Sequence, residues 1–383
     1  METLNYFFTK DLTLKCTMKP KLLILAFIFL SAFTACSIKD DYQQPSHKSW
    51  LDTHKYAVGQ TSLTLQDSKR NRPIKTEIWY PTQDTTGINV TEEYPFKLPR
   101  TSKNAVIATG KFPLILLSHG TGGNRISQMW LACELVGKGY IVASADHYGN
   151  TLDNKIPENF VRIWDRPMDM SFLLNHLLND ESWSASVATD KIGMAGFSLG
   201  GYTGMALAGA QIDFELLQQF ADTKQGELEF TVPELGDIRY LITPELVKEG
   251  NLKSIDLHDE RISAFALMAP ALGAAFQTPE QFTGVEMPLL IIGAANDKRT
   301  PSETNARHYH QLIKHSKYIE LEGEVGHYIF MNEAKNWLRK DAKQIFQDAK
   351  GINRQEIHQI VAKKVAYFFE EHLNQKNGWR WVR

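Results

Sequence analysis

Short apolar runs recur along the chain and predict buried strands. They cover residues 112–117, 140–145, 191–195, 263–268, 288–292 and 318–321. Each run is too short for a helix and is rich in residues that favour strands. Helical patterns lie between most of them, at residues 129–137, 162–178, 199–210, 302–314 and 355–373. Because strand and helix alternate, we expect an α/β fold with a mainly parallel central sheet and helices on both faces.

Two regions depart from this alternation. Residues 62–66 and 73–80 are rich in strand formers and are separated by a turn-like segment, which predicts an antiparallel hairpin at a sheet edge. Residues 81–111 follow as a long surface loop. Residues 211–259 hold charged helical pieces and turn formers without a clear strand. This interval predicts an insertion over the sheet, and such an insertion is a candidate lid.

The N-terminal segment has the pattern of an export signal. The short basic stretch from Met18 to Lys21 precedes an apolar run over residues 22–33. This run is shorter than the roughly 20 residues of a membrane span. The small residues before Cys36 resemble the lipobox of bacterial lipoproteins. That resemblance implies a leader over residues 1–36, lipidation of Cys36, membrane contact through this lipid, and an exported protein of the outer membrane facing the periplasm. Polar residues 37–55 predict a tether, and residues 56–383 the folded domain.

Charge and cysteine content narrow the function classes. The net charge of −2 over 383 residues, without a long basic run, argues against a nucleic-acid partner. The chain has three cysteines, and Cys16 and Cys36 lie in the leader, so no internal disulfide is expected in the mature chain. Cys133 lies in an apolar helical pattern and is expected to be a buried core thiol. No metal or cofactor motif is found.

The strongest chemical signal surrounds Ser198. Glycines stand two residues before and two residues after it, between an apolar run and a helix rich in small residues. This is the pattern of a nucleophile elbow, in which a sharp turn leaves no room for side chains at Gly196 and Gly200 and holds the serine in a strained conformation. An ordinary glycine-rich turn is the alternative.

A serine nucleophile requires a base and an orienting acid, and both follow in the expected chain order. Asp297 comes just after the apolar run 288–292, and His327 follows the last strand in a Gly-His context. We interpret His327 as the general base and Asp297 as the acid. A plain turn role for Asp297 is the alternative, and Glu322 and Glu324 are nearby competitors for the acid role.

The loop after the first strong parallel strand, Ser118 to Gly123, predicts an oxyanion hole. We assign its donors to the backbone amides of Thr121 and Leu199, the residue after the nucleophile. His119 is expected to support this loop. His147 follows the next strand, where lining the acyl pocket and stabilising a loop remain alternatives.

These features together resemble the bacterial hydrolases grouped with platelet-activating factor acetylhydrolase and dienelactone hydrolase, over about residues 57–373. The resemblance implies an α/β-hydrolase fold. Dienelactone hydrolases carry a cysteine nucleophile, whereas this chain has Ser198. We therefore expect a serine carboxylester hydrolase that acts through an acyl-enzyme on a small or lipid-like ester, without a cofactor or an obligate protein partner. The alternatives are an amidase, peptidase or thioesterase on the same triad, or a catalytically silent envelope binding protein.

Overall fold

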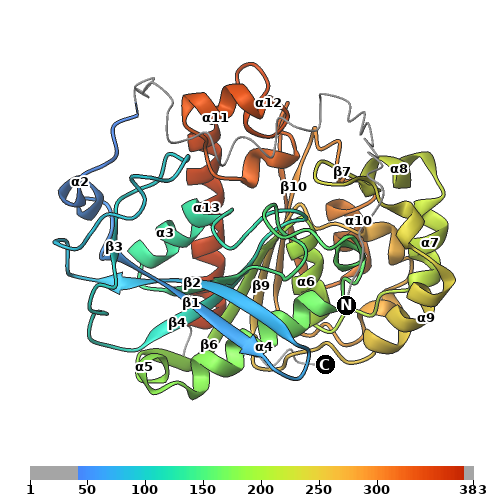
Figure 1. Cartoon of the computed structure of the whole chain (residues 1–383), viewed down its shortest axis with the longest axis horizontal. Coiled ribbons are helices and arrows are strands. Elements are labelled where there is room, and N and C mark those ends of the chain that lie inside the picture. The colour runs from blue at the N-terminus through green and yellow to red at the C-terminus, as the bar shows by residue number, and fades with distance from the viewer. Residues whose placement is uncertain (1–41, 375–383) are drawn as a thin grey trace, which may run out of the picture. The chain divides into compact units, whose positions relative to one another are not determined.

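The computed structural model describes residues 42–374 (Figure 1). The predicted leader with Cys36 lies outside the described residues, so its export and lipidation stay predictions. Among residues 42–374, none of the helices combines the length and the apolar character that a bilayer crossing requires.

A nine-stranded sheet forms the centre of the fold. Its order is β11 (Ser316–Leu321), β10 (Leu289–Ala294), β9 (Ala264–Met268), β6 (Val187–Phe197), β4 (Phe112–Ser118), β5 (Ile141–Ala145), β2 (Arg72–Thr82), β1 (Ala57–Asp67) and β3 (Thr101–Lys103). The strands from β11 to β5 are parallel, and β2 is antiparallel to both β5 and β1. The predicted mainly parallel sheet is therefore confirmed.

The edge of the sheet differs from the expectation. The predicted hairpin is present as β1 and β2, but it does not form the edge, because β3 pairs with β1 in parallel. The sequence predicted a loop over residues 81–111, which contains β3. Three residues are too few to produce a strand pattern in the sequence.

Both faces of the sheet are covered. Side chains alternate along a strand, so Leu114 and Leu116 of β4 enter one apolar core while Ile115 and Leu117 enter the other. The first core is completed by α4 (Asp165–Asn179), α6 (Leu199–Leu207) and α10 (Ala306–Leu312). The second is completed by α3 (Met129–Gly137) and α13 (Arg354–Leu373), which lie together in Figure 1. Cys133 is buried in α3, as expected.

Shorter elements connect these layers. The remaining α-helices outside the insertion are α2 (His47–Leu51), α5 (Glu181–Ser184), α11 (Asn336–Asp341) and α12 (Lys343–Phe346). The 3-10 turns are η1 (Pro157–Phe160), η3 (Gly273–Ala275), η4 (Pro279–Phe282) and η5 (His327–Phe330).

The described part of the predicted tether is attached to the domain. Tyr42 donates its hydroxyl hydrogen to the carbonyl of Leu98 at 2.9 Å. Trp50, in α2, donates its indole N–H to the carbonyl of Tyr56 at 2.9 Å. Residues 42–55 are therefore attached to the folded domain. The sequence did not predict this attachment, because the segment is polar and lacks an apolar repeat, and only single aromatic residues make these contacts.

Residues 211–259 form a group of short elements that lies between α6 and β9 in the chain (Figure 1), and its apolar side chains, including Phe214 and Leu217, join the first core. They comprise α7 (Phe214–Ala221), α8 (Lys224–Phe230), β7 (Thr231–Val232), β8 (Gly236–Asp237), η2 (Arg239–Leu241) and α9 (Pro244–Lys253). Asp213, Thr223 and Thr243 cap the three α-helices by accepting backbone hydrogen bonds. The strands β7 and β8 pair only with each other, so this segment adds no strand to the main sheet.

Candidate active site

Ser198 occupies a sharp turn between β6 and α6. Its backbone has φ 56° and ψ −118°, a region that side-chain-bearing residues rarely adopt. A Cβ atom at Gly196 would lie 2.1 Å from the carbonyl oxygen of Gly200, and one at Gly200 would lie 2.0 Å from that of Ser118. Only glycine fits at these two positions, so the predicted reason for the Gly-x-Ser-x-Gly spacing holds in the structure.

The structure brings Ser198, His327 and Asp297 into one hydrogen-bonded chain. His327 Nε2 lies 3.1 Å from Ser198 Oγ, and His327 Nδ1 lies 2.7 Å from Asp297 Oδ2. Asp297 follows β10, and His327 begins η5 after β11, so the loops at the carboxyl ends of two neighbouring strands supply these groups. All three side chains belong to residues less than 8% exposed. With Nδ1–H directed at Asp297, Nε2 is free to accept the serine proton.

Asp297 is held firmly as an anion. Its Oδ1 accepts backbone N–H hydrogen bonds from Arg299 and Thr300, both at 2.8 Å. Burial alone would raise the pKa of Asp297, but the neighbouring His327 and these hydrogen bonds lower it below its ordinary value. Thr300 also donates its hydroxyl to Oδ2 at 3.0 Å. The sequence analysis missed Thr300, although Asp followed three residues later by Thr is a typical turn arrangement that could have indicated it.

The competing acids lie elsewhere. Glu322 and Glu324 are exposed, and Glu324 accepts a hydrogen bond from the side chain of Asn296 at 2.7 Å. Asp297 is therefore the carboxylate that the fold presents to His327.

The predicted oxyanion donors flank the nucleophile. Gly120 packs so closely that a Cβ atom there would lie 3.1 Å from the Cβ of Ser198, which brings the loop of Thr121 beside the serine. Leu199 is the first residue of α6, where backbone N–H groups have no partner within the helix. In the part of the chain that the structure describes, neither the Thr121 nor the Leu199 amide donates a hydrogen bond to another protein group. Both amides are available to a substrate oxygen, and their catalytic role stays a prediction.

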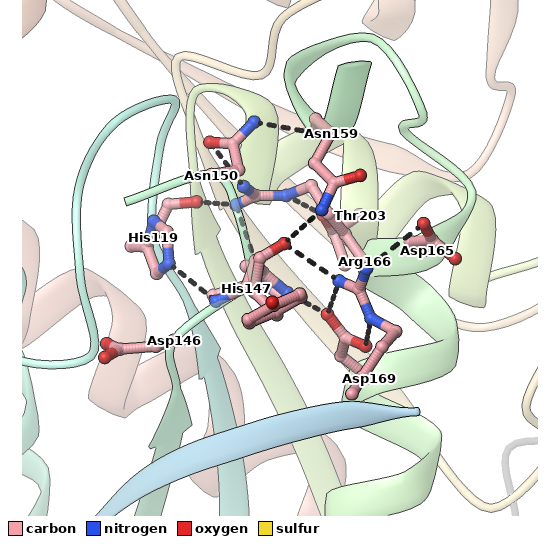
Figure 2. A network of polar contacts seen from close by, with 12 residues as sticks. His119, Asp146, His147, Asn150, Asn159, Asp165, Arg166, Asp169 and Thr203 are labelled. Carbon is pink, nitrogen blue, oxygen red and sulfur yellow. Dashed lines mark hydrogen bonds and ion pairs between the residues drawn. The ribbon is translucent and has the colours of Figure 1, made fainter. Parts of the chain in front are cut away.

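A buried polar network supports this loop from below (Figure 2). Arg166, which is 1% exposed, donates to the carbonyl of His119 and to the side chains of Thr203 (3.2 Å) and Asn150 (3.4 Å). The same Asn150 oxygen accepts the backbone N–H of Gly122 at 3.1 Å. The carbonyl and amide groups of the loop are thereby fixed at two points.

His147 belongs to this network and does not touch the nucleophile in any hydrogen bond of the described chain. Its two ring nitrogens lie 2.9 Å from Ser118 Oγ and 3.0 Å from Asp169 Oδ2. Its backbone N–H donates to His119 Nε2 at 3.2 Å, and burial lowers the pKa of both histidines well below the ordinary value. The open alternative for His147 is thus resolved toward loop support, which is also the role expected for His119. No sequence signal pointed to Arg166 or Asp169, because both lie inside an ordinary helical pattern.

Within residues 42–374, no group of three or more histidine, cysteine, aspartate or glutamate side chains is arranged to hold a metal ion. The hydrogen-bonded chain at Ser198 places a hydroxyl group against a base, beside two free amide donors.

Comparisons with known proteins agree with the fold. The family description "Platelet-activating factor acetylhydrolase, isoform II" matches residues 25–152. A ferulic acid esterase from Streptomyces cinnamoneus has a similar structure, with a TM-score of 0.57 and 19% sequence identity over 86% of this chain and 94% of that chain. The chain has the α/β-hydrolase fold and is similar to this family over residues 25–152. The family description supports the predicted class of enzyme, a carboxylic ester hydrolase, and the similar structure supports the fold.

The matched family segment covers only part of this α/β hydrolase. It includes the oxyanion loop and His147 but ends before Ser198, Asp297 and His327. The assignment of these three residues therefore depends on their geometry.

Proposed function

We propose that this α/β hydrolase is a serine carboxylester hydrolase with Ser198 as nucleophile, His327 as general base and Asp297 as orienting acid. The observation that carries the proposal is the unbroken chain from the strained Ser198 hydroxyl through His327 to the buried Asp297. A strained nucleophile on a rigid elbow, with an oriented base and two free amides nearby, is the arrangement that acyl transfer requires.

The proposed reaction has two halves. Ser198 Oγ attacks the ester carbonyl carbon while His327 takes the hydroxyl proton, and the amides of Thr121 and Leu199 hold the oxyanion. The carbon–oxygen bond to the alcohol then breaks, and His327 returns the proton to the leaving alcohol. Water attacks the acyl-enzyme, gives a proton to His327, and the acid leaves as Ser198 regains its hydrogen.

Esters are favoured over amides as substrates by the names of the similar proteins, which are an acetylhydrolase family and a ferulic acid esterase. We propose a small or lipid-like ester. Support for a lipid-like ester comes from the family description, which names the lipid platelet-activating factor.

We further propose that lipidation of Cys36 places the enzyme on the envelope membrane.

We also propose that residues 211–259 act as a lid. Contacts between the insertion and the body support the lid. Arg299, two residues after Asp297, donates to the carbonyl of Thr231 in β7, and Arg162 pairs with Glu249 in α9 at 3.0 Å. Polar contacts of this kind can open locally, whereas Phe214 and Leu217 of α7 are buried in the first apolar core and would stay in place.

A chromogenic ester assay tests the proposed reaction. Purified protein is mixed with p-nitrophenyl esters of two to twelve acyl carbons, and the early time course is recorded. A rapid release of one equivalent of p-nitrophenol followed by slower turnover is expected where hydrolysis of the acyl-enzyme limits the rate. Ser198→Ala should abolish both phases, whereas Ser263→Ala, a half-buried serine before β9, should leave them unchanged. Turnover that persists in folded Ser198→Ala would overturn the proposal.

A further inference from the structure

The hairpin β7–β8 of the insertion carries Glu234 onto the oxyanion loop. Val232 pairs with Gly236, which leaves residues 233–235 as the hairpin loop. A Cβ atom at Gly122 would lie 2.2 Å from Oε1 of Glu234, so the carboxyl group rests directly against the backbone of Gly122. Gly122 follows Thr121, the predicted oxyanion donor. Glu234 therefore lies beside the place where a substrate carbonyl would bind.

Glu234 also interacts electrostatically with residues beside the triad. Burial raises the pKa of Tyr328, the residue after His327, and the negative charges of Glu234 and Asp297 raise it further while Arg299 opposes them. Glu234 is thus close enough to interact with Tyr328 and Arg299. The hairpin thus approaches the loop of Thr121 through Glu234, its strand β7 accepts a hydrogen bond from Arg299 two residues after Asp297, and Ser198 is only 7% exposed.

One oxygen of Glu234 has no hydrogen-bond partner in this position. Oε2 is buried and accepts no hydrogen bond from any residue in the described range 42–374. Burial raises the pKa of Glu234, and a hydrogen bond from its own backbone N–H together with the charges of Lys155 and Arg299 only partly opposes that rise. A buried carboxylate oxygen without a hydrogen-bond donor lowers the stability of the folded protein, so the position of Oε2 calls for a specific explanation.

We propose that Glu234 is a specificity-determining residue that binds an electropositive group of the ester substrate, either a hydroxyl hydrogen or an ammonium. This inference rests on the proposed function, because it places Glu234 at the substrate of Ser198. A substrate that supplies the missing partner satisfies Oε2. An isosteric substrate without one leaves Oε2 buried and unpaired, and sites of this kind discriminate strongly against such analogues.

Pairs of esters with the same shape test this assignment. Propyl acetate is compared with 2-hydroxyethyl acetate, and 3,3-dimethylbutyl acetate with acetylcholine, which separates a neutral donor from a positive charge on the alcohol side. Methyl 3-methylbutanoate and methyl 3-hydroxybutanoate test a neutral hydroxyl donor on the acyl side. In the wild-type protein, kcat/KM for the electropositive member of at least one pair should exceed that of its partner about tenfold or more.

Two variants and one control identify the source of any preference. Glu234→Met has a similar length but no acceptor, and Glu234→Gln keeps an acceptor without the charge. A preference for the hydroxyl member should vanish in Glu234→Met and largely survive in Glu234→Gln, whereas a preference for the ammonium should vanish in both. Glu245→Met, an exposed acid in the first turn of α9, should keep the wild-type preference.

The outcomes separate this inference from the proposed function. Wild-type protein that hydrolyses p-nitrophenyl acetate but shows no preference within any pair overturns the role of Glu234 and leaves the esterase standing. A preference that survives unchanged in Glu234→Met overturns it as well. Protein that hydrolyses none of these esters overturns both.

Discussion

The hydroxyl group of Thr300 donates to Oδ2 of Asp297 at 3.0 Å and also lies 3.1 Å from Nδ1 of His327. Thr300 therefore fixes the carboxylate in the plane where it meets the histidine. Thr300→Val removes this hydrogen bond with little change of shape, and the loss of about 1 kcal/mol should lower kcat roughly five- to tenfold. Steady-state kinetics with a p-nitrophenyl ester measure this decrease in kcat.

A positioning role for Thr300 has a clear control. Thr300→Ser keeps the hydroxyl and should restore most of the lost kcat, while KM stays close to wild type in both variants. Equal rates in Thr300→Val and the wild-type protein would show that the backbone amides of Arg299 and Thr300 hold Asp297 without help.

Replacing the acid itself should have a much larger effect. Asp297→Asn preserves the size of the side chain but presents an amide to Nδ1 of His327, which favours the wrong tautomer. We expect kcat to fall about 10⁴-fold, as is typical for this change in other triads. Glu324→Gln, on the exposed competitor, should change kcat less than twofold. If Asp297→Asn lowered kcat less than tenfold, another carboxylate would have to orient the histidine.

The close approach at Gly200 predicts a stability effect. In Gly200→Ala the added methyl carbon would lie 2.0 Å from the carbonyl oxygen of Ser118, which belongs to the central strand β4, so the two groups would overlap. We expect the free energy of unfolding to fall by about 3 kcal/mol, measured by urea denaturation. Gly326→Ala is a matched control, because its Cβ would lie 3.8 Å from its nearest neighbour at φ −102°, and its effect should stay within about 0.5 kcal/mol. Equal stability of the two variants would contradict the packing described for the elbow.

The sequence predicted the sheet and the three central residues because each leaves a local pattern. Buried parallel strands appear as short apolar runs, and the elbow requires glycines at fixed spacing around Ser198. Chain order then directed attention to Asp297 and His327, which the structure brings into contact.

The supporting residues could not be found in the same way. Arg166 and Asp169 acquire their roles from strands and loops that are distant in the chain, and nothing near them distinguishes them from other polar helix residues. Glu234 depends on where a short hairpin folds over Gly122, and two-residue strands leave no periodic signal. The edge strand β3 was missed for the same reason.

Buried neutral histidines should make the protein sensitive to acid. The ring of His358 is buried, stacks on Trp130, and donates its Nε2–H to the carbonyl of Ile329. Burial, assisted by the charge of Arg354, lowers the pKa of His358 to about 3. The unfolded chain binds this proton near pH 6.5 and the folded protein only near pH 3, so stability is full above pH 6.5 and is lost as the pH falls through this window. The slope is about 1.4 kcal/mol per pH unit for one such group.

A titration variant measures this contribution. His358→Gln keeps a donor but does not titrate, so between pH 7 and pH 5 it should lose about 2 kcal/mol less stability than the wild-type protein. His258→Gln, at an exposed position, should follow the wild-type curve. Urea denaturation at several pH values provides the data, and parallel curves for His358→Gln and wild type would contradict the assignment.

The central claim is that Ser198 is an activated nucleophile, and covalent labelling tests it most directly. Folded protein is treated with a fluorophosphonate, and its intact mass is compared with that of Ser198→Ala treated in the same way. We predict a single adduct in the wild-type protein, located at Ser198 by peptide mapping and absent from the variant. No adduct in folded protein, or an adduct that persists in Ser198→Ala, would contradict the account.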